Sequence, residues 1–338
     1  MNIYALCTVS SAVDILNSLK SKINISGVVG LSKRDSGDSI SGYVYFSKYC
    51  KSNNIKFFPV NSYSLDGPQD VKKLKSIKID LLLVIGWQRL IPEWLIKQCK
   101  VAAIGIHGSA NGISQGRGRS PQNWALILGM KKFYISLFQI DQGADSGAVI
   151  DTKSFELSDF DDIKTSYYKT GFLVADMIVD FVKNTSYFNC FAKAQSDNAK
   201  YLPKRTPEDG EIDWTRKTTE IYNFVRGLTK PYPGAFSVTK DFRIIIWKAR
   251  PFGLEGGSQK EGKVVKIFFN GDILIKTKDG FLLIEDYTIK PDRKRHLLKE
   301  SLLLNSGDFK KQMKTIVNRH YKKFPNLQLS DDILRKTR

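Results

Sequence analysis

Short, wholly apolar runs that alternate with segments of helical periodicity constrain the fold of this chain most. The two clearest runs are 79–87 (IDLLLVIGW) and 101–106 (VAAIGI), and the helix candidate PEWLIKQC separates them. Each run has the length of a strand and is far shorter than the ~20 apolar residues that span a bilayer. Strands that are apolar on both sides belong to parallel sheets covered by helices on both faces. We therefore predict that the first ~190 residues form an α/β domain with a doubly wound, mainly parallel sheet.

The pattern changes beyond residue 190. Residues 193–214 are polar, contain prolines and lack periodicity, which is typical of a linker between domains. After a helix candidate at 218–228, short apolar segments with Gly and Asp turns predict a smaller antiparallel β-barrel domain of OB-like type. The predicted organisation is an α/β domain at 1–192, a linker at 193–214, a barrel at 215–290 and a basic helical tail at 291–338.

Composition narrows the class of protein. Hydrophobic content of 42% with 26% charged residues is that of an ordinary globular chain. The N-terminus lacks the basic start and cleavage site of a signal peptide, so we expect no secretion. Because the cysteines are dispersed without a C-x-x-C pattern, we expect neither a metal site nor a disulfide framework, and we expect a reducing cytoplasm. The four are Cys7, Cys50, Cys99 and Cys190.

The net charge of +19 indicates anionic partners or simply a lysine-rich, solvated surface. Part of this charge is local, because residues 291–338 carry 13 Lys and Arg against 5 Asp and Glu. That stretch lacks the interleaved aromatic residues of a single-strand nucleic-acid binder. The solvated surface is the favoured interpretation, and nucleic-acid binding stays open.

Polar residues follow the predicted strands at the edge where parallel sheets bind ligands. His107, one of only three histidines, ends the run IGIH, and Asp141 and Asp145 lie in the loop 138–147 (FQIDQGADSG). Taken singly, each has a structural explanation: a satisfied buried histidine, or aspartates in turns. The chain has no G-x-x-x-x-G-K-[ST] and no G-x-G-x-x-G after its first strand, so it shows neither a nucleoside-triphosphate loop nor a dinucleotide fingerprint.

The order of these pieces is more specific than any one of them. The chain reads I-H-x-S, then R-G-R-S-P-x-N-W, then D-x-G-x-D-S-G, and 201–236 ends in TKPYPGAF after a D-G-x-I-D-W element. This order resembles the formyltransferases that use 10-formyltetrahydrofolate. It is most similar to the sugar N-formyltransferases, such as the formyltransferase domain of the aminoarabinose–lipid A enzyme. The likeness covers roughly residues 1–290 and makes the first domain the catalytic one.

The resemblance implies a set of site residues and no metal. His107 would be the catalytic histidine that handles the proton lost by the attacking amine, a role suited to imidazole near neutral pH. Asp145 would orient it, and Arg119 would stabilise charge in the transition state. Arg117, Arg119 and Asn111 would contact the substrate. The folate would lie between two loops, contacting Trp87, Gln88, Arg89, Leu90, Ile91, Asp141, Gln142, Gly143, Ala144 and Asp145.

One position departs from the family pattern. The family has an asparagine two residues before the histidine, where it stabilises the oxyanion, but this chain has Gly105. Losing such a donor costs about 10²–10³ in rate, so it must be replaced or done without. Asn111 is a conceivable replacement, although with Gly112 it also reads as a turn. The departure argues against the tRNA-directed branch of the family.

We therefore expect a cytoplasmic N-formyltransferase that modifies a nucleotide-linked amino dideoxy sugar for a surface polysaccharide such as an O-antigen or lipopolysaccharide. Methionyl-tRNA formyltransferase is the nearest alternative, favoured by the net charge. A non-catalytic folate-binding homologue is the alternative of another class. A homodimer is the default expectation for the assembly.

Overall fold

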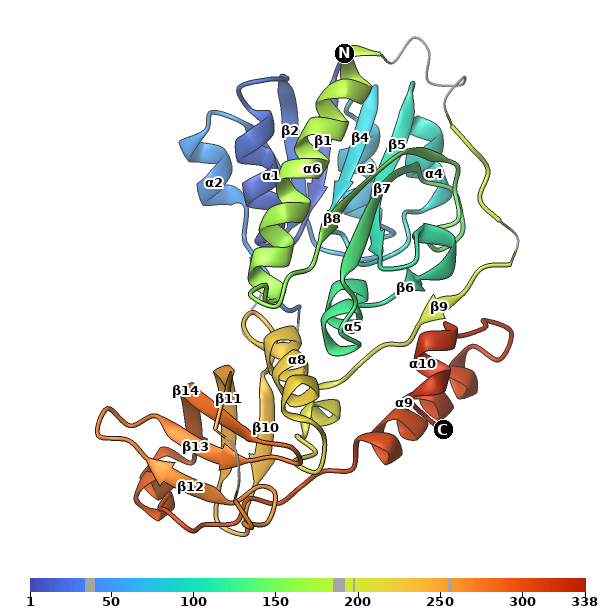
Figure 1. Cartoon of the computed structure of the whole chain (residues 1–338). Helices are drawn as coiled ribbons and strands as arrows, with labels where there is room; N and C mark the ends of the chain where they lie inside the picture. Colours follow the sequence, from blue (N-terminus) through green and yellow to red (C-terminus); the bar gives the residue numbers. More distant parts are fainter. Residues whose placement is uncertain (34–39, 185–191, 197, 255–256) are drawn as a thin grey trace. The chain divides into compact units, whose positions relative to one another are not determined.

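The computed structural model describes residues 1–33, 40–184, 192–196, 198–254 and 257–338 (Figure 1). The chain divides into two compact units. The first unit comprises 1–117, 133–155 and 167–199, and the second comprises 118–132, 156–166 and 200–338. Each unit therefore combines segments that are distant in sequence. Cys190 lies outside the described residues.

A seven-stranded sheet in the order β3-β2-β1-β4-β5-β7-β8 forms the centre of the first unit. The first five strands of that order are parallel, and β7 pairs antiparallel with β5. The predicted mainly parallel sheet is confirmed. Its strands are β1 (Ile3–Cys7), β2 (Ile25–Leu31), β3 (Lys56–Val60), β4 (Leu81–Ile85), β5 (Ala102–Ser109), β7 (Lys132–Gln139) and β8 (Val149–Glu156).

Helices cover both faces of this sheet, because its central strands are buried on both sides (Figure 1). On one face α1 lies beside α6, where Ile15 packs against Gly171. On the other face α3 and α4 enclose a core that includes Leu6, Leu74 and Leu95. The helices are α1 (Ser11–Leu19), α2 (Ser47–Ser52), α3 (Pro68–Lys75), α4 (Glu93–Gln98) and α6 (Ile163–Lys183).

An antiparallel five-stranded sheet in the order β10-β11-β14-β13-β12 forms the centre of the second unit. Residues 301–305 bridge its two edge strands: Val264 of β12 donates its N–H to Leu302, and Asn305 donates its N–H to Val238 of β10. The barrel is therefore completed by a segment beyond the last strand. The strands are β10 (Ala235–Val238), β11 (Arg243–Phe252), β12 (Val264–Ile267), β13 (Ile273–Lys276) and β14 (Phe281–Lys290).

Segments on either side of the predicted barrel also enter the core of the second unit. Trp214 is fully buried in the predicted linker, and its indole N–H donates to Ser237 at 3.2 Å. Phe309 and Met313, in the predicted tail, pack in the same core. The second half of 193–214 is thus a packed segment rather than a loose connection, because its few apolar residues are all enclosed.

The remaining elements include two longer helices, α8 and α9, and several short ones. The helix predicted at 218–228 is α8 (Thr218–Leu228), with the bounds expected. The others are η1 (Ile113–Gln115), β6 (Arg117–Gly118), α5 (Pro121–Ile127), β9 (Tyr201–Leu202), η3 (Pro207–Gly210), η4 (Asp292–Leu297), α9 (Phe309–Lys323) and α10 (Asp331–Arg335). No helix within the described residues is long and apolar enough to cross a bilayer.

Candidate active site

His107 lies near the end of β5 and is 8% exposed. Its Nε2 is 2.8 Å from the carbonyl oxygen of Gly116. Since a carbonyl oxygen can only accept, Nε2 must carry a proton and donate it. This bond fixes both the ring orientation and the tautomer, and it leaves Nδ1 as the atom that can gain or lose a proton.

Asp145 faces that second nitrogen, with its Oδ2 3.3 Å from Nδ1 of His107. If neither atom carried a proton, two lone pairs would oppose each other across this distance in a mostly buried place. A single proton placed between the two atoms removes this repulsion, so the geometry allows the pair to take up one proton. Asp145 has a φ of +54°, a left-handed conformation that costs free energy in non-glycine residues, although aspartate adopts it more readily than most.

Gln195 holds the main chain of the loop that contains Asp145. Its Nε2 donates to the carbonyl oxygens of Asp145 at 2.8 Å and Gly147 at 2.7 Å. Its Oε1 accepts from Arg117 Nη2 at 2.9 Å and from Ser114 Oγ at 3.2 Å. One side-chain amide therefore joins the aspartate loop to the glycine-rich loop after β5. Gln195 lies in the predicted linker 193–214, where no motif distinguishes it.

The two arginines of the R-G-R motif have different surroundings. Arg117 is 8% exposed, and both its Nε and its Nη2 point at Gln195. Arg119 belongs to the second unit, where its N–H donates to the carbonyl oxygen of Leu202 at 3.2 Å. Asn111 is exposed two residues after β5, and its N–H donates to Ser109 Oγ. Contacts of these three side chains with substrate stay predictions.

The loop after β4 reaches the same edge of the sheet as His107. The strands β4 and β5 are parallel with Val84 opposite Gly105, so the chain leaves β4 at the level of the histidine. Trp87 is buried against the ring of Tyr63, with the ring centroids 4.8 Å apart. Among the residues that the structure describes, the Nε1–H of Trp87 has no hydrogen-bond partner, which leaves a buried donor for a polar ligand.

The rest of this loop also contacts Tyr63, a residue that the sequence analysis missed. Gln88 donates its N–H to the Tyr63 hydroxyl at 3.1 Å, and the Arg89 guanidinium lies 4.8 Å from the Tyr63 ring centroid. Leu90 is 59% exposed, whereas Ile91 is buried. An exposed leucine beside a fixed main chain suits the flat, partly apolar ring of a pterin.

The loop after β7 is organised by Asp141. Its Oδ1 accepts from the N–H of Gly143 at 3.0 Å and from Ser146 Oγ at 2.7 Å. Gln142, Gly143 and Ala144 are exposed at the tip of the loop. The carboxylate of Asp141 is thus engaged in shaping the turn, and the exposed tip is the part that can meet a ligand.

Phe138 explains the departure at Gly105. A Cβ on Gly105 would lie 2.6 Å from Cζ of Phe138 and 3.1 Å from Cγ1 of Ile140. Phe138 pairs directly with Gly105 across β5 and β7 and is 5% exposed. An asparagine side chain has no room at this position, because the aromatic ring already occupies it. Within the described residues no group of three or more His, Cys, Asp or Glu is placed to hold a metal.

Comparison with known proteins agrees with the class of protein that the sequence pattern indicates, a formyl-transferring enzyme. Residues 16–181 match the family model described as formyl transferase, and 204–303 match the formyl transferase C-terminal domain. The chain belongs to the formyltransferase family.

The similar proteins include two curated relatives and a solved structure with different names. The bifunctional polymyxin resistance protein ArnA of Wigglesworthia glossinidia brevipalpis is 31% identical over 63% of this chain, which spans only 33% of that protein. The methionyl-tRNA formyltransferase of Thermodesulfovibrio yellowstonii is 30% identical over 67% of this chain and 70% of its own. The solved structure of WlaRD, a sugar 3N-formyl transferase crystallised with dTDP and 5-N-formyl-THF, shares the fold with a TM-score of 0.57 at 18% identity, covering 86% of this chain and 98% of that one.

Proposed function

We propose that the chain transfers the formyl group of 10-formyltetrahydrofolate to the amine of a nucleotide-linked amino sugar, a precursor of a surface polysaccharide made in the cytoplasm. The observation that carries the chemistry is the His107–Asp145 pair at the edge of the sheet. The amine attacks the formyl carbon, a tetrahedral oxyanion forms, and the C–N bond to the folate then breaks. The attacking nitrogen must lose a proton on the way, and the folate nitrogen must gain one.

The pair is suited to that proton transfer. With Asp145 ionised and Nδ1 of His107 unprotonated, the proton taken from the amine relieves the opposition of the two lone pairs. The Nε2 bond to Gly116 holds the ring while this happens, so the imidazole does not have to reorient. The same proton is then available to the departing folate nitrogen.

Three observations support the folate as the formyl donor. Trp87 presents a buried Nε1–H that no described residue accepts, and Leu90, three residues later, is exposed. The tip of the 139–147 loop is exposed as well. In the family these two loops hold the pterin, and WlaRD was crystallised with 5-N-formyl-THF. The oxyanion would be stabilised without an amide at position 105, with Asn111 and Arg119 as the candidate donors.

The sugar acceptor is favoured by the likeness to ArnA and by Gly105, which removes the family asparagine. Methionyl-tRNA is the second candidate acceptor. Two observations favour methionyl-tRNA: the match to the Thermodesulfovibrio enzyme covers 70% of that protein, and the net charge of this chain is +19. A basic surface attracts the phosphate backbone of a nucleic acid.

The test uses the purified full chain with 10-formyltetrahydrofolate and a panel of acceptors: UDP- and dTDP-linked 3-amino and 4-amino sugars, and aminoacylated initiator tRNA. Mass spectrometry detects the formylated product. We expect turnover with one nucleotide-linked amino sugar and none with tRNA, and loss of turnover in His107→Ala. Turnover with tRNA alone would overturn the sugar acceptor. Folate binding without turnover on any acceptor would indicate a non-catalytic homologue.

A further inference from the structure

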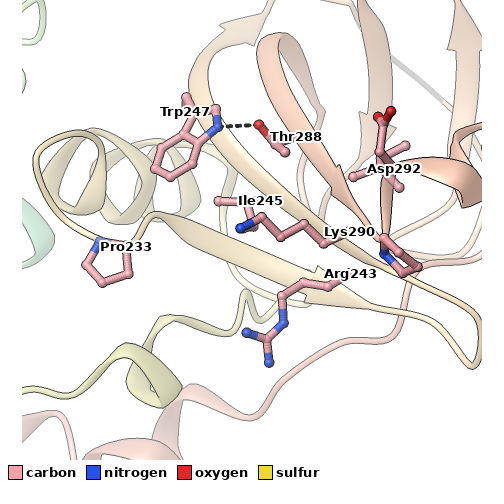
Figure 2. A pocket seen from close by; sticks show the side chains of 9 residues that line it. Pro233, Arg243, Ile245, Trp247, Thr288, Lys290 and Asp292 are labelled. Atoms are coloured by element: carbon pink, nitrogen blue, oxygen red, sulfur yellow. Dashed lines mark hydrogen bonds between the residues drawn. The ribbon is translucent and has the colours of Figure 1, made fainter. Parts of the chain in front are cut away.

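A hollow lies on the sheet of the second unit, where the TKPYPGAF element meets β11 and β14 (Figure 2). It has a volume of about 1110 Å³ and a mainly apolar lining that includes Pro233, Ile245 and Trp247. Its size is ample for a nucleotide-sized ligand. No residue that lines it belongs to the candidate active site.

Two cations stand side by side in this hollow. Arg243 and Lys290 are directly opposite each other in the β11–β14 register, and both side chains are exposed. Like charges at opposed positions of an antiparallel pair are destabilising. Among the described residues no salt bridge is found for either cation, and the Arg243 guanidinium lies 4.1 Å from the centroid of the Phe236 ring. Asp292, which also lines the hollow, directs its carboxylate away from both cations in Figure 2. A bound anion would remove the repulsion.

An aromatic ring is held in place next to the cations. The indole N–H of Trp247 donates to Thr288 Oγ1 at 2.9 Å, which fixes the ring on the sheet. Gly234 has a φ of +88°, and a Cβ there would lie 2.7 Å from the Trp247 ring. Because residue 234 of the PYPGAF sequence is a glycine, the main chain can lie against this tryptophan. The preceding residue, Pro233, lines one side of the hollow. Lys230, which pairs with Asp286 at 3.9 Å, lies 5.1 Å from the centroid of the same ring.

We propose that this hollow is a second ligand site, which binds a nucleoside diphosphate. The planar base packs against Trp247 and Pro233, and the phosphates pair with Arg243 and Lys290. A guanidinium fork beside an ammonium matches phosphate oxygens better than a single carboxylate, and a fixed indole is a platform for a base. The site does not take part in formyl transfer, so it goes beyond the proposed function and stands whether or not that function is correct.

Isothermal titration of the full chain with UDP and with dTDP tests the proposal. The starting protein for this experiment is the His107→Ala variant. Arg243→Gln and Lys290→Gln are each introduced separately into this background. We expect each of these two variants to weaken nucleotide binding at one site by about tenfold or more, as for loss of a charge-assisted bond. Lys248→Gln is the matched control: it removes the same charge from β11, but Lys248 pairs with Glu285 and does not line the hollow. It should leave binding unchanged.

Further ligands separate the possible sources of the signal. Inorganic pyrophosphate and uridine alone should bind more weakly than UDP, and Trp247→Phe should lower the affinity for UDP and uridine while sparing pyrophosphate. The proposal is overturned if no nucleotide binds, or if Arg243→Gln and Lys290→Gln bind UDP like the background protein. It is also overturned if only a single-stranded oligouridylate or tetrahydrofolate binds there. Thermal melting checks that all variants remain folded. Arg243→Gln and Lys290→Gln, both at exposed positions, should melt like the background protein.

Discussion

Replacing Gln195 tests the architecture of the active site most directly. Gln195→Ala removes the acceptor for two N–H groups of Arg117, whose side chain is 8% exposed and cannot be fully hydrated. A hydrogen bond to a charged group contributes about 1.5–3 kcal/mol, and each lost bond to a loop carbonyl about 0.5–1.5 kcal/mol. These contributions share one side chain and are not additive, so we expect a loss of about 2–4 kcal/mol. Such a loss lowers the melting temperature of a unit of this size by roughly 5–10 °C.

The effect on catalysis should exceed the effect on folding. Asp145 holds a left-handed conformation next to the carbonyl that Gln195 binds, and once released it moves Oδ2 away from Nδ1 of His107. A displacement of about 1 Å at a reacting group costs around 10² in rate. We therefore expect kcat to fall about a hundredfold, with a smaller change in KM.

Gln195→Glu separates the two functions of the amide. A carboxylate still accepts from Arg117 and so preserves much of the stability. It cannot donate to the carbonyl oxygens of Asp145 and Gly147 and instead repels them. We expect Gln195→Glu to melt close to the wild type and yet to be at least as inactive as Gln195→Ala.

The assay is the initial rate of formyl transfer to the acceptor found in the panel, measured beside the melting temperature. Gln115→Ala is the matched control, because Gln115 makes one bond to the carbonyl oxygen of Asn198 and none to the aspartate loop. It should keep wild-type kcat. If both Gln195 variants also kept wild-type kcat while His107→Ala abolished it, the reasoning would be refuted.

Three further predictions follow from single contacts. His107→Asn should lower kcat about 10²–10⁴-fold, and the lost bond to Gly116 should cost about 0.5–1.5 kcal/mol, as initial rates and thermal melts will show. Gly105→Asn should cost about 1–3 kcal/mol by overpacking against Phe138, and its additional cost should be smaller in a Phe138→Ala background. Melting temperatures that are unchanged by Gly105→Asn would contradict this. Burial raises the pKa of the Cys50 thiol to about 11 and that of Cys99 to about 12. The unfolded thiols ionise near pH ~8.5, so the free energy of unfolding should fall as pH rises above that value. Peptide mapping should find both thiols nearly unalkylated by iodoacetamide at pH 8 in the folded chain.

Local patterns in the sequence were sufficient to predict several helices and strands of this protein. The apolar runs at 79–87 and 101–106 are the strands β4 and β5, and the segment 218–228 is α8 with the expected bounds. Short-range periodicity reports which faces a segment buries, and this fixes the parallel sheet. The order of the I-H, R-G-R-S-P and D-S-G motifs was sufficient to identify the family. It also pointed to His107 and Asp145, whose Nδ1 and Oδ2 atoms lie 3.3 Å apart in the fold.

Only the tertiary structure decided how that pair is held. Gln195 lies 50 residues from Asp145 and 78 from Arg117, in a stretch without periodicity, so no local signal connects them. The ring of Phe138 fills the space beside Gly105 because β7 runs antiparallel to β5, a pairing that no motif records. The barrel is likewise closed by residues 301–305, outside the range that strand patterns indicated. A sequence determines its elements by what each segment buries locally, whereas contacts between distant polar groups form only once those elements have packed.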